Sequence, residues 1–116
     1  MTAAIDPMDF RHAMGHFATG VSIITTRDGE GRPYGITVSS FASLSLSPPL
    51  VQWSLKDESY SLPIFSAASR FAVNLLADGQ EEASRTFCQP VDRFAAVEWE
   101  EGLHQLPLIR GSLAWI

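Results

Sequence analysis

Hydrophobic and polar positions alternate in short runs along most of the chain, which predicts a fold built mainly from β-strands. A β-branched run at 21–26 and an alternating run at 34–41 flank a polar turn at 27–32, so these segments predict a β-hairpin. Gly29 and Gly31 in the turn are able to take positive φ. Further strands are predicted for the apolar runs at 50–55, after Pro48-Pro49, and at 71–76 and 111–116.

Helical periodicity is confined to short segments. Asp6 is placed to cap a helix that begins at Pro7 and ends near Gly20, with an apolar stripe formed by Phe10, Met14 and Phe17. Short helices are also expected within 59–68, interrupted or begun by Pro63, and at 79–87, with acids in its first turn. A loop-rich stretch at 91–106 is expected to be anchored by Phe94, Val97 and Trp99. Together these elements predict a small barrel, mainly β, with capping helices.

Composition narrows the class of protein. The chain has 116 residues, 46% hydrophobic and 18% charged, which is enough for one packed domain. Its net charge of −5 and the absence of a basic run argue against a nucleic-acid or membrane surface. No apolar run reaches the ~20 residues that a membrane span needs, and the N-terminus does not read as a signal peptide. The lone Cys88 indicates a reducing, cytoplasmic location, and we expect this side chain to be buried.

Hydroxyl side chains gather in two segments, 37–47 and 54–61, and the second segment holds Lys56, the only lysine of the chain. In an extended strand Thr37, Ser39 and Phe41 would share one face, and the intervening residues the other. Hydroxyl and backbone donors can bind a phosphate, and the two segments would converge if their strands are neighbours. The alternative, an ordinary solvated surface, remains open at this point.

Other chemistries have weaker support. His12 and His16 have the i, i+4 spacing of a helical metal site, but a third ligand is not identified, so we predict no metal. The chain lacks a G-x-S-x-G elbow, which disfavours a Ser-His-Asp hydrolase. It also lacks the glycine-rich signatures of Rossmann and P-loop nucleotide sites.

Eight segments in order, over nearly the whole chain, resemble the flavin reductase-like family, the short-chain NAD(P)H:flavin oxidoreductases. The matching segments are FRHAMGHFATGV (10–21), GITVSSF (35–41), SLSPPL (45–50), SLKDESYS (54–61), FAVNLL (71–76), the helix at 80–87, RF (93–94) and PLIRGSLA (107–114). The resemblance implies a split β-barrel of the FMN-binding type and a homodimer with flavin sites at or near its interface.

The same resemblance implies the ligands and the residues that hold them. Family members take FMN or FAD, accept hydride from NADH or NADPH, and often supply reduced flavin to a separate monooxygenase. Cofactor-binding roles are implied for Thr37, Val38, Ser39 and Ser40 at the ring and ribityl chain, for Ser54 and Leu55 beneath the ring, and for Ser59 and Ser61 at the phosphate. No catalytic residue is implied, because the flavin carries the redox chemistry and the protein positions it.

Family members usually continue with further strands, including a Gly-Asp-His-like and a Gly-Arg-Val-like segment, so residues 1–116 are expected to form a single domain without its usual C-terminal part. An alternative hypothesis is therefore a flavin-binding or electron-transfer module without reductase turnover. A third is a dimerisation or regulatory domain that keeps the fold and has lost the site.

Overall fold

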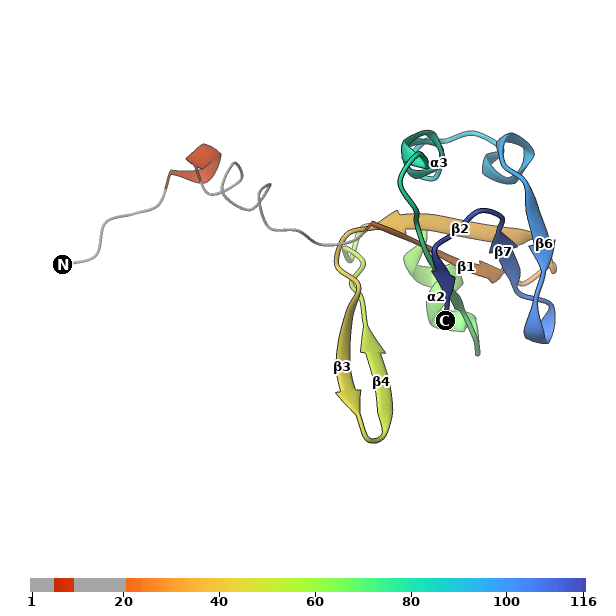
Figure 1. The fold of residues 1–116 in the computed structure, drawn as a ribbon, viewed down its shortest axis with the longest axis horizontal. Helices are drawn as coiled ribbons and strands as arrows, with labels where there is room; N and C mark the ends of the chain where they lie inside the picture. The colour runs from red at the N-terminus through yellow and green to blue at the C-terminus, as the bar shows by residue number, and fades with distance from the viewer. Residues whose placement is uncertain (1–5, 10–20) are drawn as a thin grey trace.

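The computed structural model describes residues 6–9 and 21–116, and these form a mainly β structure with short helices (Figure 1). The predicted cap of the first helix is confirmed, because the Met8 N–H donates to Asp6 Oδ1 at 2.8 Å. The rest of that predicted helix, with His12 and His16, lies outside the described residues. None of the helices in the described part is long and apolar enough to cross a membrane.

The largest sheet has four antiparallel strands in the order β2-β1-β5-β8. Their bounds are β1 Ser22–Arg27, β2 Pro33–Val38, β5 Ala72–Leu75 and β8 Ala114–Trp115. The predicted β1–β2 hairpin is confirmed, with Ser22 opposite Val38. Strand β2 ends at Val38 instead of running to Phe41 as predicted. The two edges of this sheet are therefore β2 and β8.

The turn between β1 and β2 needs only one residue with positive φ. Gly31 takes φ 79°, whereas Gly29 does not take a positive φ. The reason is the Asp28 carboxylate, whose Oδ1 accepts hydrogen bonds from the N–H groups of Glu30 and Arg32 at 2.9 and 3.0 Å. This side chain shapes the first half of the turn without a left-handed glycine.

Two small sheets flank the main one, formed by β3 Ala42–Leu46 with β4 Pro49–Gln52 and by β6 Trp99–Glu101 with β7 Pro107–Ile109. No strand was predicted for the hydroxyl-rich residues of β3. Their alternating Ser and Leu side chains form a strand that pairs with β4, with a shift of register between Ser43 and Ser45. This hairpin projects from the body of the molecule (Figure 1).

Side chains from β1 separate the core into two clusters on opposite faces of the main sheet. Ile23 packs with Phe87, Phe94 and Ile109, on the side of α3 Glu81–Thr86 and the 3-10 helix η1 Arg93–Ala96. Ile24 packs with Val38 and Val73, and α2 Leu62–Ala67 covers this face through Phe65. The helices at α2 and α3 and the packing of Phe94, Val97 and Trp99 in the first cluster confirm the predictions.

The prediction that Cys88 is buried was wrong, since its side chain is exposed. It follows Phe87, which is fully buried at the end of α3. The phenyl ring takes the inward position at this helix end, and the next residue is left at the surface.

A buried polar network joins the main sheet to β7. The Asn74 side chain donates to Ile23 O at 2.9 Å and to Thr25 Oγ1 at 3.1 Å, and accepts from the Ile109 N–H at 2.8 Å. Thr25 Oγ1 in turn donates to Pro107 O at 2.6 Å. Buried polar groups need such partners, and here they place β7 across β1 and β5. Over residues 6–9 and 21–116 the strands form three open sheets rather than one closed barrel.

Candidate functional site

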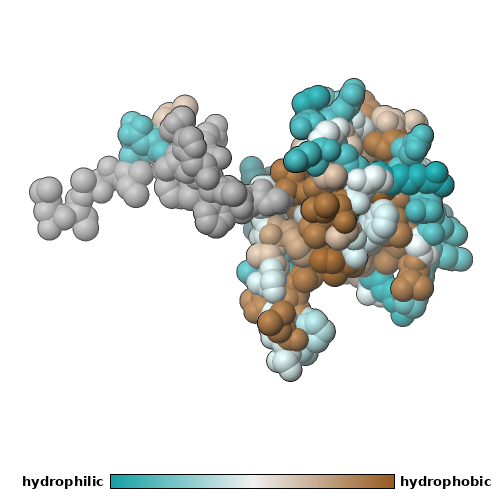
Figure 2. Space-filling view, viewed as in Figure 1, coloured by the Kyte–Doolittle hydropathy of each residue, from teal (hydrophilic) through white to brown (hydrophobic). Residues whose placement is uncertain are grey.

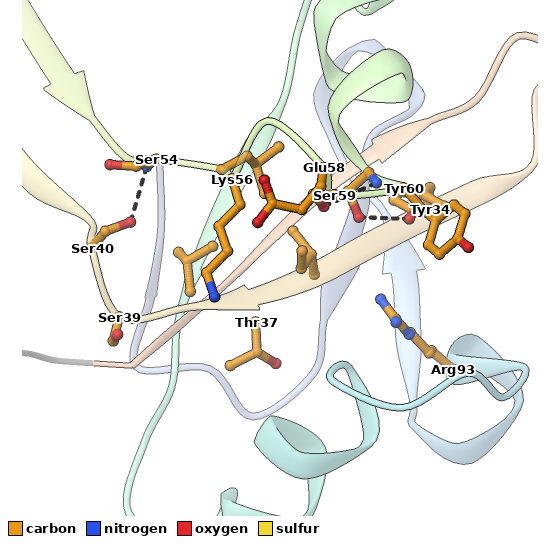
Figure 3. A pocket seen from close by; sticks show the side chains of 14 residues that line it. Tyr34, Thr37, Ser39, Ser40, Ser54, Lys56, Glu58, Ser59, Tyr60 and Arg93 are labelled. Atoms are coloured by element: carbon orange, nitrogen blue, oxygen red, sulfur yellow. Dashed lines mark hydrogen bonds between the residues drawn. The ribbon is translucent and has the colours of Figure 1, made fainter.

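A pocket with a volume of about 570 Å³ lies between β2 and the loop at 54–61. All eight residues predicted to bind a cofactor line it: Thr37, Val38, Ser39, Ser40, Ser54, Leu55, Ser59 and Ser61. The β3–β4 hairpin connects the last pocket residue of the first hydroxyl segment, Ser40, to the start of the second segment, at Ser54. Because the two strands of the hairpin pair with each other, its two ends lie side by side. The Ser54 N–H donates to Ser40 Oγ at 2.9 Å, which fastens those ends (Figure 3).

Several of the predicted hydroxyls already have partners within the protein. Thr37 Oγ1 donates to Ser84 O at 2.7 Å, and so ties β2 to α3. Ser61 is almost fully buried, and its Oγ lies 2.7 Å from the Tyr34 hydroxyl. Ser59 Oγ accepts from the Ser61 N–H at 3.1 Å. The last two bonds orient the hydroxyls of Ser59 and Ser61, so a ligand there meets groups that are already positioned.

The predicted division of faces along 36–41 was wrong in one respect. Phe41 was expected to share a face with Thr37, but it packs against the core cluster of Ile24 and Val38. Since β2 ends at Val38, strict alternation of side chains stops there. Phe41 therefore helps to seat the chain at the start of the projecting hairpin rather than lining the pocket.

The pocket lining also includes two cations and one carboxylate, namely Lys56, Arg93 and Glu58. Arg93 comes from η1, and its Nη1 and Nε donate to Gly35 O at 2.7 Å and Gln89 O at 2.8 Å. Figure 3 shows the Lys56 ammonium reaching toward β2, while Arg93 approaches from the start of η1. Sequence reasoning missed Arg93 as a site residue, although the segment RF at 93–94 was among the matching motifs.

The pocket combines an apolar wall with polar groups at its rim. Ile36, Val38 and Leu55 supply apolar surface, and the hydroxyls together with Lys56 supply donors. Such a lining suits a flat ring that carries a polar tail with a phosphate. Among the described residues, no three His, Cys, Asp or Glu side chains gather as a metal site would require.

The groups with displaced pKa values lie outside the pocket lining, in the turn after β1. Hydrogen bonds from the backbone N–H of Arg32 and Glu30 and from the Arg32 side chain lower the pKa of Asp28. The same carboxylate raises the pKa of Arg32, first through the hydrogen bond and then through its charge. These shifts belong to the structure of the turn.

Residues 14–116 match the profile of the flavin reductase like domain. The chain is 44% identical over 108 residues to the reductase component of the flavin-dependent trigonelline monooxygenase of Acinetobacter baylyi, covering 92% of this chain and 35% of that protein. It is 44% identical over 105 residues to the FMN reductase (NADH) SmoA of Agrobacterium fabrum, covering 90% of this chain and 60% of that protein.

A solved structure shows the same fold. It is the NADH:FAD oxidoreductase SgcE6 of Streptomyces globisporus in complex with NAD and FAD fragments, with a TM-score of 0.86 and 38% sequence identity. The match covers 99% of this chain and 72% of that one. Across five curated relatives, the chain spans between 35% and 62% of the length of the protein it matches.

Proposed function

The chain belongs to the flavin reductase-like family, and from this premise we propose that it is an NAD(P)H:flavin oxidoreductase that acts on FMN or FAD with NADH or NADPH. The observation that carries the proposal is the convergence of all eight predicted binding residues on one pocket. Relatives named FMN reductase (NADH) and NADH:FAD oxidoreductase support this choice of ligands.

The residues of the pocket fit a flavin. We assign the apolar wall of Ile36, Val38 and Leu55 to the ring, and Ser59, Ser61 and Lys56 to the phosphate. A charge-assisted hydrogen bond to a phosphate is stronger than a neutral one. This local donor set offsets the net charge of −5, which would otherwise repel an anionic ligand.

When bound, a flavin supplies the redox chemistry by accepting a hydride equivalent from the nicotinamide. The contribution of this chain is then to bind and orient. The Tyr34–Ser61 and Ser40–Ser54 hydrogen bonds hold the polar groups in place before a ligand arrives. The apolar wall excludes water from one side of the ring. No side chain needs to act as a general acid or base in this scheme.

A partner that consumes the reduced flavin is part of the proposal. Two relatives are named as the reductase component and the reductase subunit of flavin-dependent monooxygenases. By analogy, we propose that this chain delivers reduced flavin to a monooxygenase component. A cytoplasmic location is consistent with the single cysteine of the chain.

We also propose that residues 1–116 form a single domain of the split-barrel type and that the protein is a homodimer. Apolar side chains on the projecting hairpin support the dimer, since Leu44, Leu46 and Leu50 are 59%, 90% and 46% exposed. Figure 2 shows hydrophobic surface on this hairpin. An exposed apolar patch of this kind is typical of an interface with another chain.

The test is a titration of the purified protein with FMN and FAD, followed in the same cuvette by NADH or NADPH. We expect saturable binding and then bleaching of the flavin absorbance. Binding without bleaching would contradict the reductase function and favour a flavin-binding or electron-transfer module. If neither flavin binds, the pocket is not a flavin site. That result would favour the hypothesis of a dimerisation or regulatory domain that has lost the site. A matched control is Leu103→Ala, at an exposed side chain outside the pocket lining, which should titrate like the unchanged protein.

A further inference from the structure

A second pocket, of about 230 Å³, adjoins the flavin pocket along the same strand. The first half of β2, from Pro33 to Gly35, lines the second pocket, whereas Tyr34 and the residues from Ile36 onward line the first. Tyr34 and Arg93 belong to both linings. The two spaces are therefore consecutive along β2, with these two side chains at their junction.

Arg93 is fixed at this junction by backbone groups. Its Nη1 and Nε donate to Gly35 O and Gln89 O. Its interactions are thus with carbonyl dipoles, and its positive charge is not cancelled by a carboxylate in those bonds. A guanidinium held in this way is suited to an anion that passes from one pocket to the other.

The second pocket has the chemistry of a nucleoside site rather than of a second phosphate site. Pro33, Pro90 and Val91 give it apolar surface against which a base can lie. Asp92 adds a carboxylate, which can accept hydrogen bonds from ribose hydroxyls but would repel a phosphate. The volume of the second pocket is less than half that of the flavin pocket. Its size therefore suits one part of a ligand rather than a complete second cofactor.

We propose that the second pocket receives the adenosine half of FAD, with the pyrophosphate passing Arg93, and that this chain therefore binds FAD in preference to FMN. The proposal rests on the proposed function, because it takes the first pocket as the flavin site. The inference adds a choice between FMN and FAD to the proposed function. The first pocket alone does not distinguish these two flavins, since both carry the same ring and first phosphate.

The experiment compares the dissociation constants of FMN and FAD, measured by flavin fluorescence in the absence of NADH. We expect FAD to bind at least about tenfold more tightly than FMN, which corresponds to one charge-assisted contact and some added apolar burial. Val91→Trp fills the second pocket from a half-exposed position that lies outside the first. It should weaken FAD about tenfold and leave FMN within about twofold, because only the adenosine is displaced.

Two further variants keep the outcome interpretable. Leu103→Trp places the same ring at an exposed site outside both pockets and should change neither constant. Arg93→Gln should weaken FAD more than FMN, and its melting temperature shows whether loss of the Gly35 and Gln89 contacts disturbs the fold.

The possible failures are distinguishable. Tight FMN binding with no preference for FAD, or equal losses of both flavins in Val91→Trp, would overturn the inference and leave the proposed function intact. If Val91→Trp weakens NADH, measured by quenching of protein fluorescence, and leaves FAD unchanged, the adenosine site belongs to the nicotinamide dinucleotide and the inference is wrong. Loss of all flavin binding in the unchanged protein would overturn both proposals.

Discussion

The hydroxyl groups of Tyr34 and Ser61 share a hydrogen bond of 2.7 Å at one end of the proposed flavin pocket. Ser61 is only 4% exposed, so its Oγ is held by this contact rather than by water. If the tyrosine donates, the Ser61 hydrogen remains available to a ligand oxygen. Tyr34 would then act as a positioning residue for the phosphate end of the site.

The first prediction concerns this end of the pocket. Replacing Ser59 and Ser61 together with Ala should sharply weaken FMN, since each phosphate hydrogen bond contributes roughly 1.5–3 kcal/mol when charge-assisted. Riboflavin lacks the phosphate and should be barely affected. Tyr34→Phe should also lower the affinity for FMN relative to the affinity for riboflavin, but by less. Equal losses for FMN and riboflavin, measured by fluorescence titration, would contradict the assignment of the phosphate.

A second prediction concerns the contact between β2 and α3. A Cβ at Gly35 would lie 2.8 Å from Cε1 of Phe87, which is fully buried and cannot easily move. Gly35→Ala should therefore lower the free energy of unfolding by about 1–3 kcal/mol through overpacking. Gly29→Ala is the matched control, because its Cβ meets open space, and it should stay within about 0.5 kcal/mol. Urea unfolding of the two variants measures the difference, and equal stabilities would show that Phe87 can give way.

The Asn74 network supports a third prediction. Asn74→Leu removes three hydrogen bonds and leaves buried polar groups without these partners, so stability should fall by about 2 kcal/mol or more. Thr26→Val is a useful comparison, since Thr26 is equally buried but makes a single side-chain bond, to Arg70 O at 2.8 Å. That variant should cost about 1 kcal/mol. Similar chemical denaturation midpoints for the two would argue against a special role of the network.

Acid stability gives the fourth prediction. Because the folded pKa of Asp28 lies below its unfolded value, its stabilising contribution is present above the ordinary carboxyl pKa. That contribution is lost as the pH falls through the lower, folded pKa. Asp28→Asn should reduce stability at neutral pH and flatten the acid limb of the curve of melting temperature against pH. Glu98→Gln, at an exposed acid, serves as the control. An unchanged acid limb in Asp28→Asn would contradict the prediction.

The projecting hairpin gives the fifth prediction. Leu46 is 90% exposed, so Leu46→Asp should leave the melting temperature of the isolated fold nearly unchanged. If the hairpin forms the dimer interface, the same change should shift the protein from dimer to monomer at micromolar concentration in sedimentation analysis. Leu103→Asp places the same charge at an 84% exposed leucine away from the hairpin and should not shift it. A dimer that survives Leu46→Asp would place the interface elsewhere.

Local signals account for the parts of the fold that could be predicted from sequence. The β-branched residues of β1, the glycine of its turn and the Asp6 cap act within a few residues, and the structure agrees with each. Strand β3 was missed because serines between exposed leucines look like a solvated turn when the partner strand is unknown. Strand β7 was missed because it has only three residues and begins at a proline.

In the candidate site, too, local features could be predicted from the sequence and tertiary contacts could not. Both hydroxyl segments were visible in the sequence because they are local clusters, and all eight predicted residues line one pocket. The place of Arg93 was not visible, since it depends on contact with Gly35, 58 residues earlier in the chain. Likewise, nothing near Thr37 shows that its hydroxyl bonds to Ser84 O. Such roles are set by tertiary packing rather than by local pattern.

The junction of β1, β5 and β7 consists of amide, hydroxyl and carbonyl groups, none of which gains or loses a proton in the physiological range. Acid should therefore loosen this protein from its surface inward, beginning at the Asp28 turn. Amide hydrogen exchange would then find the Ile109 N–H among the last to open at low pH. The hydrogen bonds at the centre of the fold therefore do not depend on the pH in this range.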